Sequence, residues 1–312
     1  MRIGVDLGGT KIEAVALDDA DGRLLARQRV PTPRDDYQAT LEAIARLVLG
    51  IEQQLARRGS VGVGMPGALS PATGRVKNAN STWLNGQTLD QDLSRLLDRP
   101  LRFANDANCF ALSEAVDGAA ASARLVFGVI VGTGTGGGLV LDRRIWTGPN
   151  AIGGEWGHNP LPWPRDDEDP GPPCYCGQRG CIETWLSGPG LARDHERATG
   201  EALSALEVQA RAEAGDGHAE ASLQRYEDRM ARALAGLINV LDPDVIVLGG
   251  GLSQLRRLYE NVPRLWGAHV FSDQVVTRLS PPLHGDSSGV RGAAWLWAPG
   301  EWRFSVDRGG TP

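Results

Sequence analysis

Three of the chain's four cysteines lie within eight residues, in the stretch CYCGQRGC that runs from Cys174 to Cys181. In a reducing compartment, clustered cysteines serve as metal ligands or redox groups more often than as structural disulfides. A disulfide between Cys174 and Cys176 would be strained because only one residue separates them, and a thioredoxin-type CxxC is absent. Metal binding is therefore the leading interpretation of this stretch.

His158, in EWGHNP, is the nearest nitrogen donor upstream of these thiols. Together with Cys174, Cys176 and Cys181 it would complete a tetrahedral Cys3His zinc site. Because protein atoms would fill all four positions, we expect this zinc to be structural and not to activate water. The alternative, three thiols without a metal, does not explain the glycine turns that fold the loop back. The fourth cysteine, Cys109, lies alone in a helical stretch and is expected to be part of the core.

Two glycine- and threonine-rich turns interrupt apolar, strand-like runs of sequence. GGTK follows the run RIGVDL, and GTGTGGG follows LVFGVIV. In residues 2–30 and again in residues 124–147, three such runs alternate with turns, which predicts an antiparallel meander in each segment. Glycine amides can approach an anion without obstruction by Cβ, and threonine hydroxyls add donors, so two such tips facing each other could hold an oligophosphate. For either tip alone, a plain hairpin turn is the simpler interpretation.

Two common nucleotide-binding motifs are excluded. Gly132, Gly134 and Gly137 fit the pattern GxGxxG, but a second strand pattern follows them where a dinucleotide-binding unit requires a helix. No GxxxxGKS or GxxxxGKT phosphate loop occurs in the chain. A third glycine cluster, which ends at Gly250 and Gly251, joins the buried-strand pattern VIVL to a helical pattern. It fits a ligand-binding loop and a plain connector equally well.

Between the two hairpins the sequence has the pattern of an α/β protein. Residues 36–58 have helical spacing, residues 59–71 form a strand that enters a Gly/Pro loop, and a further strand ends at Asn105 and Asp106 before another helical stretch. Ligands bind at such strand ends in open α/β sheets, which would suit Asp106 as a reacting carboxylate. Aspartate is also favoured as an ordinary helix N-cap, and this segment alone does not decide between the two roles.

Composition and charge restrict the class of protein. The 312 residues are 41% hydrophobic and 22% charged, as in ordinary globular proteins, and they suffice for two lobes. The formal charge of -6, from 32 basic and 38 acidic residues, argues against a broad nucleic-acid surface. No run of about 18 apolar residues and no signal-peptide pattern is present, so we expect no membrane partner and a cytoplasmic location.

Six motifs occur in an order that resembles the ROK family of sugar kinases and repressors. They are DLGGTK at 6–11, GMPG at 64–67, ANDAN at 104–108, GTGTGGG at 132–138, GGEWGH at 153–158 and CYCGQRGCIE at 174–183. The match covers residues 2–297. It implies a two-lobed α/β fold of the actin-like ATPase (ribonuclease H-like) type, with ATP between the lobes, a hexose deeper inside and a structural zinc loop. The smaller lobe would be 1–118 with a C-terminal helix at 289–298, and the larger lobe 119–288.

Carried over residue by residue, the family pattern gives each motif a role. Asp106 would be the catalytic base that takes the proton from the attacking sugar hydroxyl, and Asp6 would hold Mg2+ directly or through water, unless it only caps a turn. Lys11 would add positive charge at the phosphates, unless it is simply solvated. The sugar would be bound by Gly67, Asn105, Asp106, Glu155, His158 and Glu183. ATP would be bound by Gly4, Asp6, Gly8, Gly9, Thr10, Lys11, Gly132, Thr133, Gly134, Gly250 and Gly251.

The same resemblance implies a role for the zinc, at His158, Cys174, Cys176 and Cys181. If His158 binds the metal through one ring nitrogen, the other would face the sugar pocket, and the residues at the exit of the loop would be fixed in place. The zinc loop would then position the groups that bind the sugar.

Longer segments resemble bacterial fructokinases of the manno(fructo)kinase type more than glucokinases. Among them are PTPRDDY at 31–37, KNANSTWLNG at 77–86 and HGDSSGVRGAAWLW at 284–297. This resemblance implies phosphorylation of D-fructose by ATP to D-fructose 6-phosphate, with mannose as a second substrate. Glucokinase or N-acetylhexosamine kinase activity on the same scaffold is the alternative. Because the family often forms dimers, a homodimer is expected.

A non-enzymatic function within the family is sugar-dependent regulation. The family's repressors carry a helix-turn-helix domain before the first hairpin, whereas DLGGTK begins here at Asp6, so an enzyme without a nucleic-acid partner is expected. A sugar-sensing regulator without a DNA-binding domain is the alternative.

Two segments have no assigned role. Residues 159–173, NPLPWPRDDEDPGPP, lengthen the spacing between His158 and Cys174, and their prolines and acidic run predict a solvated surface loop. The alternatives are a cover for the sugar or a contact with a second subunit. Residues 299–312 have little apolar periodicity and are predicted to be loosely ordered.

Overall fold

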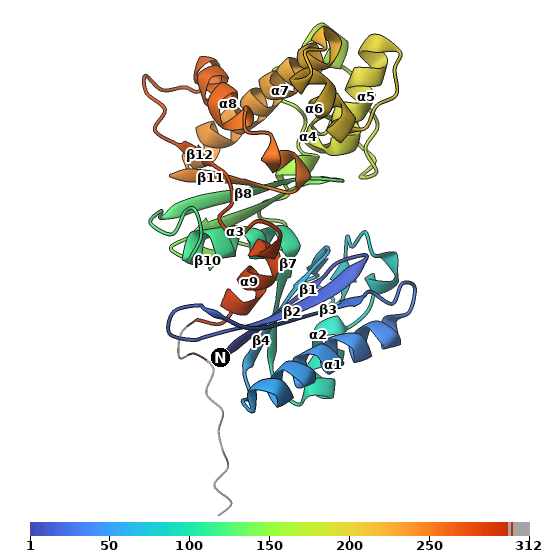
Figure 1. The fold of residues 1–312 in the computed structure, drawn as a ribbon, viewed down its shortest axis with the longest axis vertical. Helices are drawn as coiled ribbons and strands as arrows, with labels where there is room; N and C mark the ends of the chain where they lie inside the picture. The colour runs from blue at the N-terminus through green and yellow to red at the C-terminus, as the bar shows by residue number, and fades with distance from the viewer. Residues whose placement is uncertain (299–300, 302–312) are drawn as a thin grey trace, which may run out of the picture. The chain divides into compact units, whose positions relative to one another are not determined.

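The computed structural model describes residues 1–298 and Glu301, apart from the side chain of Asp166 (Figure 1). These residues form two units: one contains Met1–Cys109 and the residues from Gly289 onward, and the other is Phe110–Ser288. The predicted loose tail at 299–312 lies outside the described residues except for Glu301. In the part of the chain that the structure describes, no helix is long and apolar enough to cross a membrane.

The first unit contains a five-stranded sheet in the order β3-β2-β1-β4-β7. The predicted antiparallel meander is confirmed by β1 (Arg2–Leu7), β2 (Lys11–Leu17) and β3 (Leu24–Pro31). β4 (Ser60–Met65) then pairs in parallel with β1, and β7 (Leu101–Asn105) pairs in parallel with β4. Every residue of β4 is buried, which is typical of a parallel strand covered on both faces.

Helices cover this sheet. α1 (Tyr37–Leu55) begins at the N-cap Asp36, whose carboxylate accepts a hydrogen bond from the backbone of Ala39, and its apolar face joins the core of the unit together with α2 (Leu89–Leu97). α9 (Ser288–Trp295) lies directly on β1, since a Cβ at Gly4 would come within 2.0 Å of the Val290 carbonyl oxygen. A two-stranded sheet, β5 (Ala68–Leu69) and β6 (Val76–Lys77), follows β4.

The second unit repeats this plan with the order β10-β9-β8-β11-β12. β8 (Leu125–Val131), β9 (Thr135–Leu141) and β10 (Arg144–Ile145) form the second predicted meander, which is also confirmed. β11 (Val245–Gly249) and β12 (Arg278–Ser280) continue the sheet in parallel with β8. Both sheets thus consist of three antiparallel strands followed by two parallel ones, which agrees with the prediction of two related lobes.

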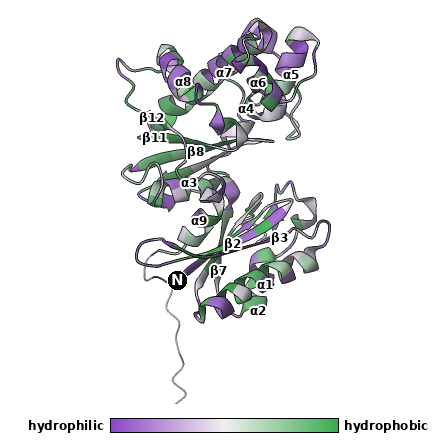
Figure 2. Ribbon diagram, viewed as in Figure 1, coloured by the Kyte–Doolittle hydropathy of each residue, from purple (hydrophilic) through white to green (hydrophobic). Residues whose placement is uncertain are grey.

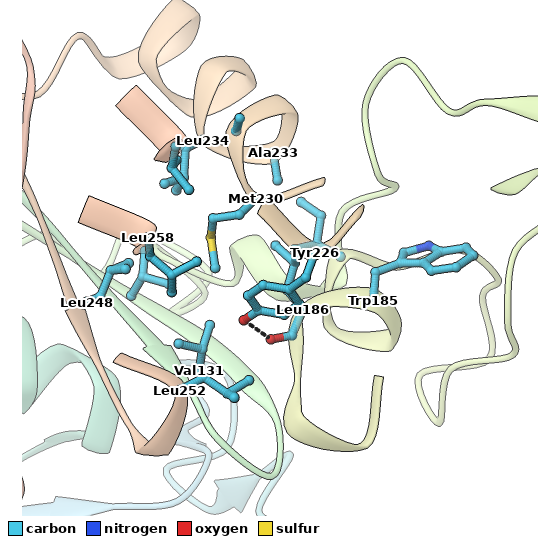
Figure 3. Close-up of a cluster of buried hydrophobic side chains, with 14 of the residues drawn as sticks. Val131, Trp185, Leu186, Tyr226, Met230, Ala233, Leu234, Leu248, Leu252 and Leu258 are labelled. Atoms are coloured by element: carbon cyan, nitrogen blue, oxygen red, sulfur yellow. Dashed lines mark hydrogen bonds between the residues drawn. The ribbon is translucent and has the colours of Figure 1, made fainter. Parts of the chain in front are cut away.

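The helices of the second unit are α3 to α8. α3 (Asp106–Val116) begins in the first unit and enters the second, and α4 (Ile182–Leu186) and α5 (Gly188–Thr199) follow the cysteine-rich loop. α6 (Ala205–Glu213), α7 (Gly217–Leu241) and α8 (Leu258–Trp266) complete the set. In Figure 2, β8 and β11 are mainly hydrophobic, whereas α5 is largely hydrophilic. Figure 3 shows part of the hydrophobic core of this unit. Within it, the Tyr226 hydroxyl donates a hydrogen bond to the Leu186 carbonyl oxygen at 2.8 Å.

The prediction of a solvated loop at residues 159–173 is wrong for part of this segment. Leu161 and Glu168 are buried, at 4% and 5% exposure, and Trp163 stacks on His269 with the ring centroids 5.0 Å apart. Arg229 and Arg232 of α7 both donate hydrogen bonds to the Glu168 carboxylate. The segment is therefore docked on α7, because its acidic run supplies the partner of two buried arginines.

Candidate active site and metal centre

The predicted catalytic carboxylate lies where β7 ends and α3 begins. Asp106 is exposed, and its Oδ1 accepts a hydrogen bond from the Ala107 backbone at 2.8 Å. The neighbouring Asn105 accepts from the same N–H through its Oδ1 and donates from Nδ2 to the Gly67 carbonyl oxygen at 3.2 Å. The N-terminal end of α3 favours a charged carboxylate. Asp106 thus has the helix-terminal bond of a cap and the exposure that a reacting base requires.

Asp6 lies near the end of β1 and is electrostatically coupled to Asp106. Burial, followed by the negative charges of Asp106 and Glu13, raises the pKa of Asp6 to about 7, although Lys11 and Arg29 oppose the shift. Asp6 and Glu13 are opposite each other in the register of β1 and β2. An added cation, such as Mg2+, would stabilise the charged form of Asp6 in this acidic surrounding.

The first glycine turn is closed by its own backbone and held by Thr32, which follows β3. The Gly8 N–H donates to the Lys11 carbonyl oxygen at 3.0 Å, and the Thr32 hydroxyl donates to the Gly8 carbonyl oxygen at 2.7 Å. Gly9 and Thr10 at the tip are exposed. The Lys11 ammonium lies 3.9 Å from the buried Glu13 carboxylate, so this lysine is not simply solvated.

The second glycine turn follows β8 and has an additional group that the sequence interpretation missed. The Gly132 N–H donates to the Gly134 carbonyl oxygen at 2.9 Å and closes the turn. Thr135, the first residue of β9, is 4% exposed, and its Oγ1 has no hydrogen-bond partner among the described residues. The repeated threonine in GTGT is the signal that could have indicated it.

The third glycine cluster lies beside the second turn. Gly250 follows β11 and is exposed, and its backbone packs against Val131, the last residue of the parallel neighbour β8. A short 3-10 helix at Gly251–Gln254 comes next, before α8. The carboxyl ends of two adjacent parallel strands therefore carry Gly132, Thr133 and Gly134 together with Gly250 and Gly251. Such strand ends are where α/β sheets bind ligands.

The four predicted metal ligands come together. The ligand atoms of His158, Cys174, Cys176 and Cys181 all lie within 4.8 Å of one another. His158 Nδ1 is 3.6 Å from Cys174 Sγ, and Cys176 Sγ is 3.6 Å from Cys181 Sγ. Ligands at 2.0–2.3 Å from a tetrahedral zinc are about 3.5–3.8 Å apart, so this donor set fits the ion in both chemistry and spacing.

The backbone builds this loop. Isolated bridges pair Pro160 with Cys181 and Pro173 with Arg179, so the strands that enter and leave the loop lie antiparallel. Burial and the neighbouring thiols raise the pKa of Cys181 to about 12, so a cation among these side chains is what would hold them as thiolates.

The second ring nitrogen of His158 contacts Tyr175. Its Nε2 is 3.0 Å from the Tyr175 hydroxyl, and the two rings meet edge to face with centroids 5.1 Å apart. Tyr175 is 82% exposed and lies between two of the cysteine ligands. We predict from the sequence that this nitrogen faces the sugar pocket. The structure adds a neighbour that sequence reasoning missed, the Tyr175 hydroxyl, which lies within hydrogen-bond distance of it.

The two predicted glutamates of the sugar site differ in their surroundings. Glu155 is exposed, and its carboxylate has no hydrogen-bond partner among the residues described by the structure. Glu183, in the first turn of α4, accepts a hydrogen bond from the Thr135 backbone at 2.9 Å. Gly4, predicted to contact ATP, is buried in β1 against α9, and packing alone accounts for a glycine there.

A cavity in the second unit lies apart from these residues. It has a volume of about 490 Å³ and is lined by the docked segment and by α4 and α5, including Asp169, Trp185, Arg193 and Arg197. No predicted site residue lines it. We therefore do not assign the candidate site to this cavity, and the predicted residues of each unit are considered at their own strand ends and loops.

The chain is similar to known sugar kinases over nearly its whole length. The chain is 41% identical over 300 residues to the N-acetyl-D-glucosamine kinase of Yersinia pseudotuberculosis, with 95% of this chain and 98% of that protein covered. The crystal structure of a ROK hexokinase from Thermus thermophilus matches with a TM-score of 0.84 at 32% identity, covering 95% of this chain and 97% of that one. A ROK family glucokinase from Streptomyces griseus, in complex with glucose and AMPPNP, matches with a TM-score of 0.75 at 26% identity, covering 95% and 98%.

The ROK family model itself matches residues 2–299. These matches span nearly the whole chain and confirm the predicted fold class, whereas the matched curated relative is named for N-acetylglucosamine and not for fructose. The chain therefore belongs to the ROK family and has the actin-like α/β fold of its sugar kinases.

Proposed function

We propose that the protein is an ATP-dependent N-acetylglucosamine kinase, which transfers the γ-phosphoryl group of ATP to a hydroxyl of N-acetyl-D-glucosamine. The observation that carries the proposal is the 41% identity to an enzyme of that name over 95% of the chain. It replaces the fructokinase prediction, which rested on short segments and receives no support from the named relative. The glucokinase with bound AMPPNP supports ATP as the phosphoryl donor.

Asp106 would act as the base in this reaction. Its carboxylate is exposed at a strand end and held by the Ala107 N–H, so one oxygen can accept the proton of the attacking hydroxyl. Asn105 would orient the same sugar through its side-chain amide, whose Nδ2 donates a hydrogen bond to the Gly67 carbonyl oxygen. Glu155, His158 and Glu183 would bind further hydroxyls.

The two glycine turns would bind the phosphates, since positioning and charge neutralisation dominate phosphoryl transfer. Backbone amides of Gly8, Gly9 and Thr10, with the Lys11 ammonium, would contact them from the first turn. Gly132, Thr133 and Gly134 would do so from the second, while Gly250 and Gly251 would pack along the adenosine. Mg2+ held by Asp6 would supply charge neutralisation at the phosphates. The residues that would bind zinc are His158, Cys174, Cys176 and Cys181. A zinc ion held by all four would be structural and would fix the conformation of the loop.

The proposal is tested by an ADP-release assay with Mg-ATP against N-acetylglucosamine, N-acetylmannosamine, glucose, mannose and fructose. We expect the highest kcat/KM with N-acetylglucosamine. A clear preference for fructose would restore the original substrate prediction, and turnover with no sugar would favour the sensor alternative. Sedimentation of the same preparation checks the predicted homodimer.

A further inference from the structure

The second glycine turn is held by the segment that leaves the metal-binding loop. Cys181 is the N-cap of α4, and Glu183 in the first turn of that helix accepts the Thr135 N–H through Oε2 at 2.9 Å. Where α5 begins, the Gly188 N–H donates to the Gly132 carbonyl oxygen at 2.7 Å. Both ends of the turn are therefore bonded to residues that follow the last cysteine ligand.

A second ligand-bearing segment packs against the same residue. A Cβ added at Gly157 would come within 1.9 Å of the Thr135 carbonyl oxygen, so the two backbones are in direct contact. Gly157 immediately precedes His158. The N–H and the C=O of Thr135 are thus each contacted by a residue within two positions of a predicted zinc ligand.

These contacts matter because the turn is rich in glycine. Two of the three residues between β8 and β9, Gly132 and Gly134, are glycines, whose backbone freedom must be lost when the turn is ordered. A hydrogen bond from a backbone amide to a carboxylate is stronger than one between neutral groups, and it is stronger still when sheltered from water, as it is at the 4%-exposed Thr135. Ordering the turn before the nucleotide arrives would spare that cost on binding.

We propose that Glu183 is a positioning residue through which the zinc loop holds residues 132–135 in their phosphate-binding conformation, so that the metal raises nucleotide affinity even without sugar. The inference rests on the proposed function, because it takes this turn as a phosphate-binding element. Glu183 Oε2 is used by Thr135, whereas Oε1 has no hydrogen-bond partner among the described residues and remains available to a sugar hydroxyl. One carboxylate would then serve both substrates.

A role for Glu183 in sugar binding alone predicts no effect on nucleotide binding in the absence of sugar. The decisive measurement is therefore calorimetric titration of Mg-AMPPNP, without sugar, into wild type, Glu183→Ala and Glu183→Gln. Each protein is measured with zinc and after its removal by a chelator. We expect removal of zinc to weaken binding to the wild type by at least about fivefold.

The two variants separate the bond from the charge. Glu183→Ala should show the weaker affinity already with zinc, and chelation should weaken it little further, because the link is missing in both states. Glu183→Gln should retain most of the affinity, since its amide oxygen can accept the Thr135 N–H. Glu196→Ala is the matched control: it removes an exposed α5 carboxylate that has no side-chain partner among the described residues, and it should behave as wild type.

The proposal would be overturned if Glu183→Ala bound the nucleotide as tightly as wild type does. It would also be overturned if chelation weakened binding to Glu183→Ala by the same factor as it weakens binding to wild type. Hydrogen exchange of residues 132–137 provides a readout that needs no ligand. Exchange there should accelerate on zinc removal and in Glu183→Ala, and unchanged exchange in both would contradict the link. A zinc-loaded wild type that binds no nucleotide would instead overturn the proposed function, and the exchange data would still decide whether the metal orders the turn.

Discussion

Glu168 accepts a hydrogen bond from Arg229 Nε at 2.7 Å, although it lies in a proline-rich, acidic segment whose composition predicts exposure to solvent. Glu168 and Arg229 are 5% and 2% exposed, and Arg232 NH2 donates to the same carboxylate oxygen at 2.9 Å. Asp194 pairs with Arg229 at 2.9 Å as well. The segment is therefore fixed to α7 by a buried ion-pair network, whose members depend on one another.

Glu168→Gln should lower the free energy of unfolding by about 3–5 kcal/mol, because removing one charge of a buried network leaves the others uncompensated. Urea unfolding measures the change. Asp167→Asn is the control, since Asp167 pairs with Arg197 at the surface and its loss should cost less than about 1 kcal/mol. If both variants lost the same free energy of unfolding, the buried Glu168 network would stabilise the protein no more than the surface ion pair of Asp167 does.

The same network predicts a dependence of stability on pH. Burial raises the pKa of Glu168, but hydrogen bonds from Arg232, from the Arg165 backbone and from Arg229 outweigh it and lower the pKa to about 2. Because the folded pKa lies below the unfolded value of 4.5, the stabilisation is complete above pH 4.5 and is lost as the pH falls toward 2. The unfolding free energy of wild type should thus fall more steeply over this range than that of Glu168→Gln; parallel curves would contradict the assignment.

The two meanders and the start of α3 could be predicted from sequence because their signals are local. Alternating apolar residues and glycine turns define strands within a few positions, and Asp106 adjoins its own helix. The clustering of the four candidate metal ligands could be predicted too, since these donors lie within 24 residues of sequence, from His158 to Cys181.

The contacts of Glu168 and Glu183 that sequence reasoning missed are long-range. The Glu168 partners follow it by 61 and 64 residues, and Thr135 precedes Glu183 by 48. The spacing of apolar and polar residues does not indicate which distant residue a carboxylate will contact. An acidic run next to prolines is therefore predicted to be solvated. Such pairings are fixed by the topology of the sheet and of α7, which only the fold supplies.

Cys176→Ser should lose bound zinc and lower the thermal stability of the second unit, because serine is a poor zinc ligand and the remaining three donors leave the tetrahedral site incomplete. Elemental analysis of the purified protein measures the metal. Cys109→Ala removes a buried thiol outside the cluster and should keep one zinc per chain. Zinc in Cys176→Ser at the wild-type level, or zinc lost from Cys109→Ala as well, would be evidence against the Cys3His assignment.

Asp6→Asn should raise stability while it abolishes turnover. The folded pKa of Asp6, about 7, is above the unfolded value of 3.8, so ionisation is unfavourable in the folded protein. The penalty is absent below about pH 4, grows as the pH rises and is complete above about pH 7. Measured without Mg2+ and nucleotide, the variant should be more stable than wild type by on the order of 4 kcal/mol at pH 8 and equal to it near pH 4. A constant difference across this range would exclude the ionisation as its cause.

Asp106→Asn should reduce kcat by at least about 100-fold and leave the dissociation constant for the sugar nearly unchanged. An amide in place of the carboxylate can still accept the Ala107 N–H, which now reaches Oδ1 at 2.8 Å, but it cannot take a proton from the sugar. Turnover is followed by ADP release and sugar binding by calorimetry. Asp21→Asn, an exposed carboxylate in the turn between β2 and β3, is the control and should match wild type in both. If the variant lost sugar binding but kept its kcat, Asp106 would be a sugar ligand and not the base. If both values matched those of wild type, Asp106 would be an ordinary helix cap with no role in the reaction.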